Sequence, residues 1–132
     1  MSRRTQQGFT LVELMITVVV LAVLVGIAVP SYRQYVVRSK RVAAQAAMMD
    51  IANREQQFLI ANRAYADKAT LESSGYAPPA DVTESYTWNV VPAAVPLPSF
   101  VITFTGTGGQ GADGALTLTS TGEKAPAEKW QR

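Results

Sequence analysis

The sequence predicts an α+β fold in which one long N-terminal α-helix packs against a small antiparallel β-sheet of three or more strands. Two observations lead to this prediction. Residues 9–62 consist mostly of good helix formers and contain a single proline. Residues 86–120 contain three short stretches in which apolar and polar residues alternate and β-branched residues are common. With 132 residues, the chain has room for one small globular core.

The first half of the predicted helix is long and apolar enough to cross a membrane. Residues 9–29 read FTLVELMITVVVLAVLVGIAV and carry one charge, Glu13. About 20 such residues span a bilayer as a helix. The polar octapeptide MSRRTQQG precedes this run, whereas an ordinary secretory signal is cleaved after its apolar stretch. Hydropathy alone therefore also allows an uncleaved membrane anchor.

The second half of the predicted helix, residues 30–62, is amphipathic. Pro30 lacks an amide donor and clashes with the preceding turn, so we expect it to kink the helix. Five apolar residues after it are spaced by three, four or seven positions and share one face of the helix. They are Ala44, Met48, Ile51, Phe58 and Leu59. We expect this face to pack against a globular head.

The remaining residues, 63–132, are expected to form that head together with residues 30–62. Residues 64–83 hold a glycine and two prolines among small and polar residues, which predicts a connecting loop. The predicted strands are Tyr86–Val91, Phe100–Thr105 and Ala115–Ser120. The segment GTGGQG, residues 106–111, opens no helix and lacks the lysine of a phosphate-binding loop. It is therefore interpreted as a flexible hairpin turn.

Composition excludes most catalytic chemistry. The chain has no cysteine and no histidine, which excludes disulfides, cysteine–histidine dyads, serine-type triads and most zinc sites. The spacing of Asp81, Glu84 and Asp113 matches no calcium loop. Arg3 and Arg4 account for the basic excess, because the other basic residues balance the ten acidic ones. We therefore expect no enzyme activity, and no catalytic residue, cofactor or metal ligand.

The string GFTLVE, residues 8–13, closely resembles the processing signal of type IV pilins and pseudopilins. In that family a short basic leader ends in glycine, and glutamate is the fifth residue after it. The resemblance implies the type IV pilin fold, a leader at residues 1–8, cleavage between Gly8 and Phe9 by prepilin peptidase, and N-methylation of Phe9. It also implies that Glu13 pairs with the Phe9 ammonium of a neighbouring subunit during assembly. The alternative is that the Glu13 side chain extends to the lipid headgroups.

This resemblance implies a structural subunit, major or minor, of a type IV pilus, serving adhesion, twitching motility or DNA uptake. Its partners would be other pilin subunits, prepilin peptidase and the assembly platform in the inner membrane. The precursor would cross the bacterial inner membrane once, with a cytoplasmic leader and a periplasmic head, and would be extracellular when assembled. The positive-inside rule opposes this orientation, because four basic residues follow the span. They are Arg33, Arg38, Lys40 and Arg41. The alternative functions are a type II secretion pseudopilin and a DNA-binding minor pilin.

The C-terminal half resembles PilE-type minor pilins. The resemblance rests on RAYA at residues 63–66, on DGALTLTSTGEK at residues 113–124 and on Trp130. Two cysteines of that pattern are missing, and Asp113 and Lys129 stand in their places. We expect these two side chains to approach each other and Trp130 to pack on the sheet and supply most of the anchoring. A disordered tail is the alternative.

Overall fold

The computed structural model describes residues 8–131. The expected basic leader therefore lies, apart from Gly8, outside the described residues. The chain divides into two units, residues 1–36 and residues 37–132, and each is described by itself. The helix α1, Leu11–Asn62, contributes to both units. Its bounds agree closely with the predicted helix, and it continues through Pro30.

The first unit is the apolar half of α1. Its side chains are exposed up to Tyr35, and an eighteen-residue window of α1 reaches a mean hydropathy of 2.8. Among residues 8–131, α1 is the one helix that could cross a membrane by length and composition. An isolated apolar helix without a covering layer requires a membrane or other helices around it.

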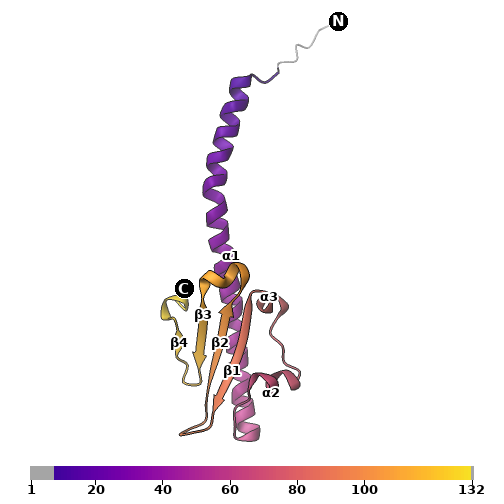
Figure 1. Cartoon of the computed structure of the whole chain (residues 1–132), viewed down its shortest axis with the longest axis vertical. Coiled ribbons are helices and arrows are strands. Elements are labelled where there is room, and N and C mark those ends of the chain that lie inside the picture. Colours follow the sequence, from indigo (N-terminus) through magenta and orange to yellow (C-terminus); the bar gives the residue numbers. More distant parts are fainter. Residues whose placement is uncertain (1–7, 132) are drawn as a thin grey trace. The chain divides into compact units, whose positions relative to one another are not determined.

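The second unit, which we call the head, is a four-stranded antiparallel sheet packed on the later turns of α1 (Figure 1). The strands are β1 (Tyr86–Ala93), β2 (Ser99–Gly106), β3 (Ala115–Thr119) and β4 (Lys124–Ala125), in that order across the sheet. The predicted α+β fold class is thus confirmed, and the three predicted strands are present. Two-residue β4 was not predicted, because it is too short to show an alternating pattern.

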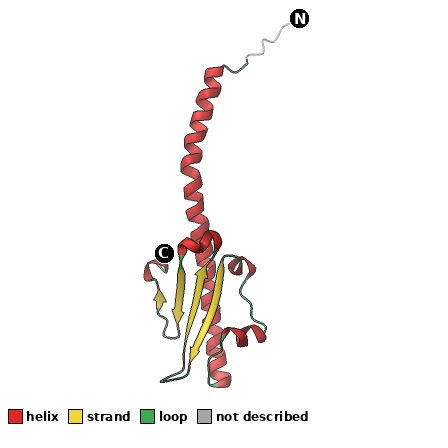
Figure 2. Cartoon of the chain, viewed as in Figure 1, coloured by secondary structure: helices red, strands yellow, loops and turns green. Residues whose placement is uncertain are grey.

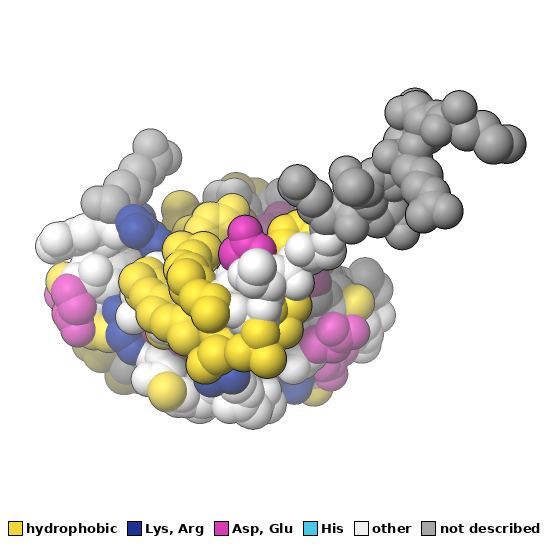
Figure 3. Space-filling model, turned by 90° about the horizontal axis from the view of Figure 1, so that it is seen from above, with side chains coloured by type: hydrophobic (Ala, Val, Ile, Leu, Met, Phe, Trp, Pro, Cys, Tyr) yellow, Lys and Arg dark blue, Asp and Glu magenta, His cyan; other side chains and the backbone are white. Residues whose placement is uncertain are grey.

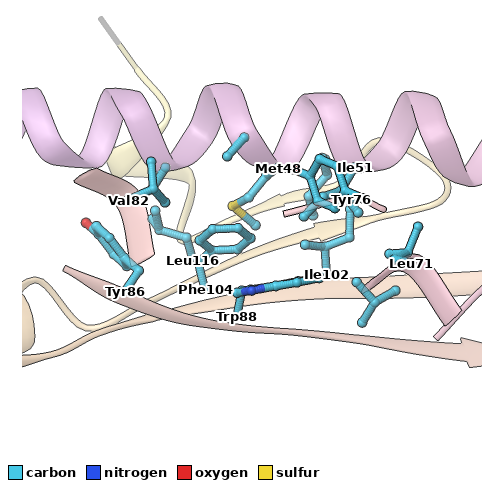
Figure 4. Packing of buried hydrophobic residues seen from close by; sticks show 14 of the residues in the cluster. Met48, Ile51, Leu71, Tyr76, Val82, Tyr86, Trp88, Ile102, Phe104 and Leu116 are labelled. Carbon is cyan, nitrogen blue, oxygen red and sulfur yellow. The ribbon is translucent and has the colours of Figure 1, made fainter. Parts of the chain in front are cut away.

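The hydrophobic core lies between α1 and the sheet. Figure 4 shows Met48 and Ile51 of α1 facing Phe104, Ile102 and Leu116 of the strands. Inward positions of β1 and β2 alternate with exposed ones, as expected for a sheet covered on one side. Ala44, Met48 and Ile51 of the predicted stripe are buried, whereas Phe58 and Leu59 are half-buried.

The connection between α1 and β1 differs from the loop predicted for residues 64–83. It contains two short helices, α2 (Lys68–Ser73) and α3 (Ala80–Thr83), shown in Figure 2. The Asp67 carboxylate caps α2 by accepting a hydrogen bond from Thr70 N at 2.8 Å. Helices this short have no full amphipathic period, so turn-forming composition masked them.

The segment predicted as a flexible hairpin turn is also ordered differently. Residues Gly108–Asp113 form a 3₁₀ helix, η1, between β2 and β3. Thr107 O accepts a hydrogen bond from Gln110 N at 2.9 Å, which closes its first turn. A second 3₁₀ turn, η2 (Ala127–Lys129), lies near the C-terminus. Both turns position polar residues of the cluster described below.

Candidate functional site

Gly8 and Phe9, the residues of the expected cleavage point, precede α1 and are exposed. Phe9 is 89% exposed, and no atom approaches the position of a Gly8 Cβ within 4 Å. Neither residue belongs to a helix or strand. A peptide bond in an exposed, irregular segment is accessible to a protease, whereas one inside a helix is not.

Glu13 caps the start of α1 together with Thr10. Thr10 N donates to Glu13 Oε2 at 2.8 Å, and Glu13 N donates to Thr10 Oγ1 at 3.2 Å. This reciprocal pair is a capping box, which satisfies two backbone donors that the first helical turn leaves unpaired. The sequence signal for this cap is the spacing T-x-x-E at residues 10–13. Glu13 therefore has a local partner within its own chain.

The surface around these residues is apolar on every side. Sixteen large hydrophobic residues among the described residues of unit 1 are over 45% exposed, among them Leu14, Val18 and Leu21. Seen from the end that carries the N-terminus, the helix displays mainly hydrophobic side chains (Figure 3). Such a surface has no covering layer within this chain and is suited to lipid or to the helices of other subunits.

A buried polar cluster in the head is centred on Asp113, whose side chain is 3% exposed. Arg41 of α1 forms a two-pronged ion pair with it, in which Nε lies 2.8 Å from Oδ2. The Tyr86 hydroxyl donates to Asp113 Oδ2 at 3.0 Å. Lys129 Nζ lies 3.9 Å from Oδ1. One carboxylate thus joins α1, β1, η1 and η2. We call this group the Asp113 cluster.

Gln110 completes the Asp113 cluster from η1. Its side-chain amide donates to the Val37 carbonyl at 2.9 Å and to the Tyr86 hydroxyl at 2.8 Å. Burial alone would raise the pKa of the Asp113 carboxyl. The hydrogen bonds from Arg41 and Tyr86 and the charges of Arg41 and Lys129 outweigh burial, and the pKa is lowered. Burial raises the pKa of Tyr86 to about 12, so its hydroxyl remains a donor.

The C-terminal segment makes three further contacts, two with the rest of the head and one within the segment itself. Gln45 Nε2 donates to the Lys129 carbonyl at 2.8 Å, and Trp130 Nε1 donates to the Ala125 carbonyl at 3.3 Å. Trp130 is half-buried and packs against the core. The structure therefore brings Asp113, Lys129 and Trp130 together. It also adds Arg41, which the sequence analysis named only as one of four basic residues that follow the span.

A cavity of about 290 Å³ lies between α1 and the C-terminal segment, and we call it the α1–tail groove. Val42, Met49 and Trp130 supply its apolar lining, while Arg38, Arg41 and Lys129 supply positive charge. Two glutamines also line it, and the described lining contains no acidic residue. The charge pattern was not visible in the sequence, because Lys129 lies far along the chain from α1.

Glu55 is a second buried carboxyl group that sequence reasoning missed. It is fully buried on the core side of α1, and its Oε2 accepts a hydrogen bond from Ala66 N at 2.8 Å. Its Oε1 is buried with no hydrogen-bond partner among the described residues. Burial raises the pKa of Glu55, the Ala66 amide opposes that shift and the charge of Asp67 adds to it. Glu55 lies four residues after Ile51 and therefore on the same face of α1, which is the sequence feature that indicates its burial.

Within residues 8–131 there is no group of three or more histidine, cysteine, aspartate or glutamate residues that could hold a metal ion. Asp81 and Glu84 lie exposed at α3, whereas Asp113 is buried among cations. The described residues present two surfaces, which are the apolar surface of unit 1 and the α1–tail groove, and one buried structural group, the Asp113 cluster.

Two family models match the chain. Residues 3–29 match the prokaryotic N-terminal methylation motif. Residues 30–119 match a family described as type IV minor pilin ComP, DNA uptake sequence receptor. The two matches meet at Pro30, and the second covers more than half of the chain. No solved structure is significantly similar to the chain.

Curated relatives match shorter parts of the sequence. Fimbrial protein EcpC of Eikenella corrodens is 48% identical over 40 residues, which are 30% of this chain and 26% of the relative. Type IV major fimbrial protein FimA of Dichelobacter nodosus is 45% identical over 49 residues, 36% of this chain and 31% of the relative. Type IV major pilin protein PilA of Myxococcus xanthus is 33% identical over 72 residues, which are 54% of this chain and 32% of the relative. The chain thus spans between about a quarter and a third of these relatives.

The family match, the methylation motif and the helix-on-sheet architecture agree with the processing signal read from residues 8–13. From these observations together, the chain belongs to the type IV pilins, in the family of the minor pilin ComP.

Proposed function

We propose that the chain is a structural subunit of a type IV pilus and not an enzyme. The exposed apolar surface of unit 1, which lies largely within the match to the methylation motif, carries this proposal. In the precursor this surface would lie in the inner membrane, with the leader in the cytoplasm and the head in the periplasm. In the filament it would pack against the helices of other pilins, which replaces lipid with protein at similar polarity.

Maturation would follow the family pattern. Prepilin peptidase would cut between Gly8 and Phe9, Phe9 would be N-methylated, and residues 9–29 would serve as both membrane anchor and filament core. Residues 30–62 and 63–132 would form the exported head. Pro30 would loosen the helix where the methylation-motif match ends and the minor-pilin match begins. The assembly platform in the inner membrane would then extract the mature subunit.

Cleavage is the most direct test of this proposal. We expect mass spectrometry of the membrane and filament fractions to find an N-terminus at methylated Phe9. Gly8→Ala should be cut in part, whereas a bulky residue at position 8 should leave the precursor uncut. An assembled protein that retains its N-terminus at Met1 or Ser2 would contradict the proposed function.

DNA uptake is a second candidate role, because the matching family is described as a DNA uptake sequence receptor. The curated relatives named above are fimbrial proteins and pilins, which favours a pilus over a type II secretion pseudopilus. Binding of the full chain to duplex DNA should be measured at two salt concentrations with and without competitor sequences. Binding that disappears with competitor of unrelated sequence would exclude a receptor role.

A further inference from the structure

The α1–tail groove has a chemical character that neither pilus assembly nor the core explains. Three cations line it, and the buried Asp113 carboxylate beneath them neutralises one, which leaves two net positive charges. Its apolar lining is exposed, since Val42 is 57% and Met49 44% accessible. Exposed apolar side chains beside unneutralised cations suit an amphipathic anion.

The form of the groove discriminates between anionic partners. Duplex DNA presents an extended line of phosphates, and its backbone is bound by basic residues along a surface. Here the cations instead gather around an apolar recess of about 290 Å³. A phospholipid has the matching pair of features, because a phosphate group adjoins apolar chains.

The position of the groove in the chain points to the same partner. Arg38 follows Val29, the last residue of the apolar run, by nine positions. Tyr32 and Tyr35 lie between them and are 69% and 70% exposed. Tyrosine is enriched at membrane–water interfaces, and clusters of basic residues next to a span bind anionic lipids. Trp130 adds an aromatic ring whose face Lys124 Nζ approaches to 5.2 Å from the centroid.

We propose that the α1–tail groove binds the headgroup of an anionic phospholipid. Arg38 and Lys129 contact the phosphate, and Val42, Met49 and Trp130 line the recess beside it. The inference rests on the proposed membrane-anchored precursor. Bound lipid holds the head at the membrane surface before assembly, and leaving the bilayer for a filament requires its release.

The test uses the full chain in detergent micelles containing equal amounts of phosphatidylglycerol and phosphatidylcholine. Native mass spectrometry then counts the lipids retained on each protein. We expect a preference for phosphatidylglycerol, and Arg38→Gln should lower that preference about fivefold, as expected for one basic residue near an anionic surface. Arg38 is suited to the test, because it is exposed and forms no ion pair within residues 8–131.

Lys40→Gln is the matched control. Lys40 has the same charge and nearly the same place in the sequence, but it does not line the groove. We expect this variant to keep the wild-type preference. Met49→Gln should lower retention of both lipids, because it makes the apolar lining polar. Circular dichroism establishes that all three variants remain folded.

Three outcomes would overturn the proposal. They are equal retention of both lipids by the wild-type chain, equal effects of Arg38→Gln and Lys40→Gln, and loss of duplex DNA binding in Arg38→Gln with lipid retention unchanged. The proposed anchoring is decided separately by whether the chain is recovered from the membrane fraction, so the two hypotheses can fail independently.

Discussion

Asp113 and Glu55 are both almost completely buried in the head, yet their surroundings differ. Arg41, Tyr86 and Lys129 surround the Asp113 carboxylate with donors and positive charge. Glu55 has one backbone donor, and its other oxygen has no partner among the described residues. The first environment stabilises the ionised acid and the second stabilises the neutral acid.

We predict that Glu55→Gln stabilises the head increasingly as pH rises. The pKa of Glu55 is raised in the folded state, so its favourable contribution is complete below the unfolded pKa and is lost as pH rises through the folded pKa. Glutamine keeps the acceptor for Ala66 N and cannot ionise. Melting temperatures from pH 4 to 9 check this, in a chain that begins at Tyr35. A constant difference between variant and wild type would show that Glu55 does not titrate in this range.

We predict that Asp113→Asn destabilises the same head by about 1–3 kcal/mol, because Arg41 loses a charged acceptor in a partly buried site. Lys129→Gln should cost less than about 1 kcal/mol, because its amine lies 3.9 Å from Asp113 Oδ1 and donates no hydrogen bond to it. Denaturant titration at pH 7 measures both. The destabilisation by Asp113→Asn should become smaller as pH falls. The pKa of Asp113 is lowered in the folded state, so its contribution to stability is complete above the unfolded pKa and is lost as pH falls through the folded pKa. Equal costs for the two variants would mean that Lys129 is the principal partner.

At the scale of elements, the connection between β2 and β3 decides whether the Asp113 cluster forms. The 3₁₀ helix η1 carries both Gln110 and Asp113 inward. A Cβ on Gly106 would lie 2.3 Å from the Gln110 carbonyl oxygen, so the chain requires glycine at the end of β2. Gly109 has open space around it and an ordinary φ.

We predict that Gly106→Ala destabilises the head by about 1–3 kcal/mol, because η1 must move and disturb the Asp113 cluster. Gly109→Ala changes the same residue type within the same connection and should stay within about 0.5 kcal/mol of wild type. Thermal unfolding compares the two. Similar losses would show that flexibility of the connection, not the close approach at Gly106, is what matters.

Helices and strands long enough to show a repeating pattern of apolar residues were predictable from the sequence. Short elements stabilised by single contacts were not. The stripe Ala44, Met48 and Ile51 indicated the buried face of α1, and alternation indicated β1 to β3. The helix α2 depends on the Asp67 cap, and η1 depends on a close approach at Gly106, which no periodic pattern records. Glu55 was missed because a charged residue within an apolar stripe is normally assigned to solvent.

At the scale of the whole molecule, the two units have opposite solvent preferences. Unit 1 exposes its apolar side chains up to Tyr35, whereas the head buries its own core. From hydropathy and the string GFTLVE, which depend on local residues alone, the sequence predicted an apolar run at residues 9–29 followed by a globular head. It predicted that Asp113, Lys129 and Trp130 would meet, but it omitted Arg41 and the α1–tail groove. Those features require residues that are distant in sequence, and no pattern in one chain specifies such pairs.

We predict that Glu13→Gln is processed normally but lowers filament yield roughly tenfold or more. Glutamine can replace glutamate in the capping box, so the start of α1 is preserved. The variant loses the negative charge that would pair with the Phe9 ammonium of the neighbouring subunit. Burying that ammonium without a partner costs more than ~1.4 kcal/mol, which is the free energy that corresponds to a tenfold change in an equilibrium constant. Thr10→Ala removes the cap and keeps the carboxylate, so it should assemble nearly normally. Immunoblots of sheared filaments measure the yield of each variant. The prediction is wrong if Thr10→Ala fails to assemble while Glu13→Gln assembles.

The Asp113 cluster has a consequence for how the head reaches its native state. Contacts that join α1, β1, η1 and η2 through one carboxylate form and dissociate without electron transfer. Oxidising enzymes, glutathione and reductants therefore have no bond to make or break here, and the chain has no cysteine to mispair. The head should refold as completely in dithiothreitol as in air, and its closure should respond to acid and salt instead of to redox potential.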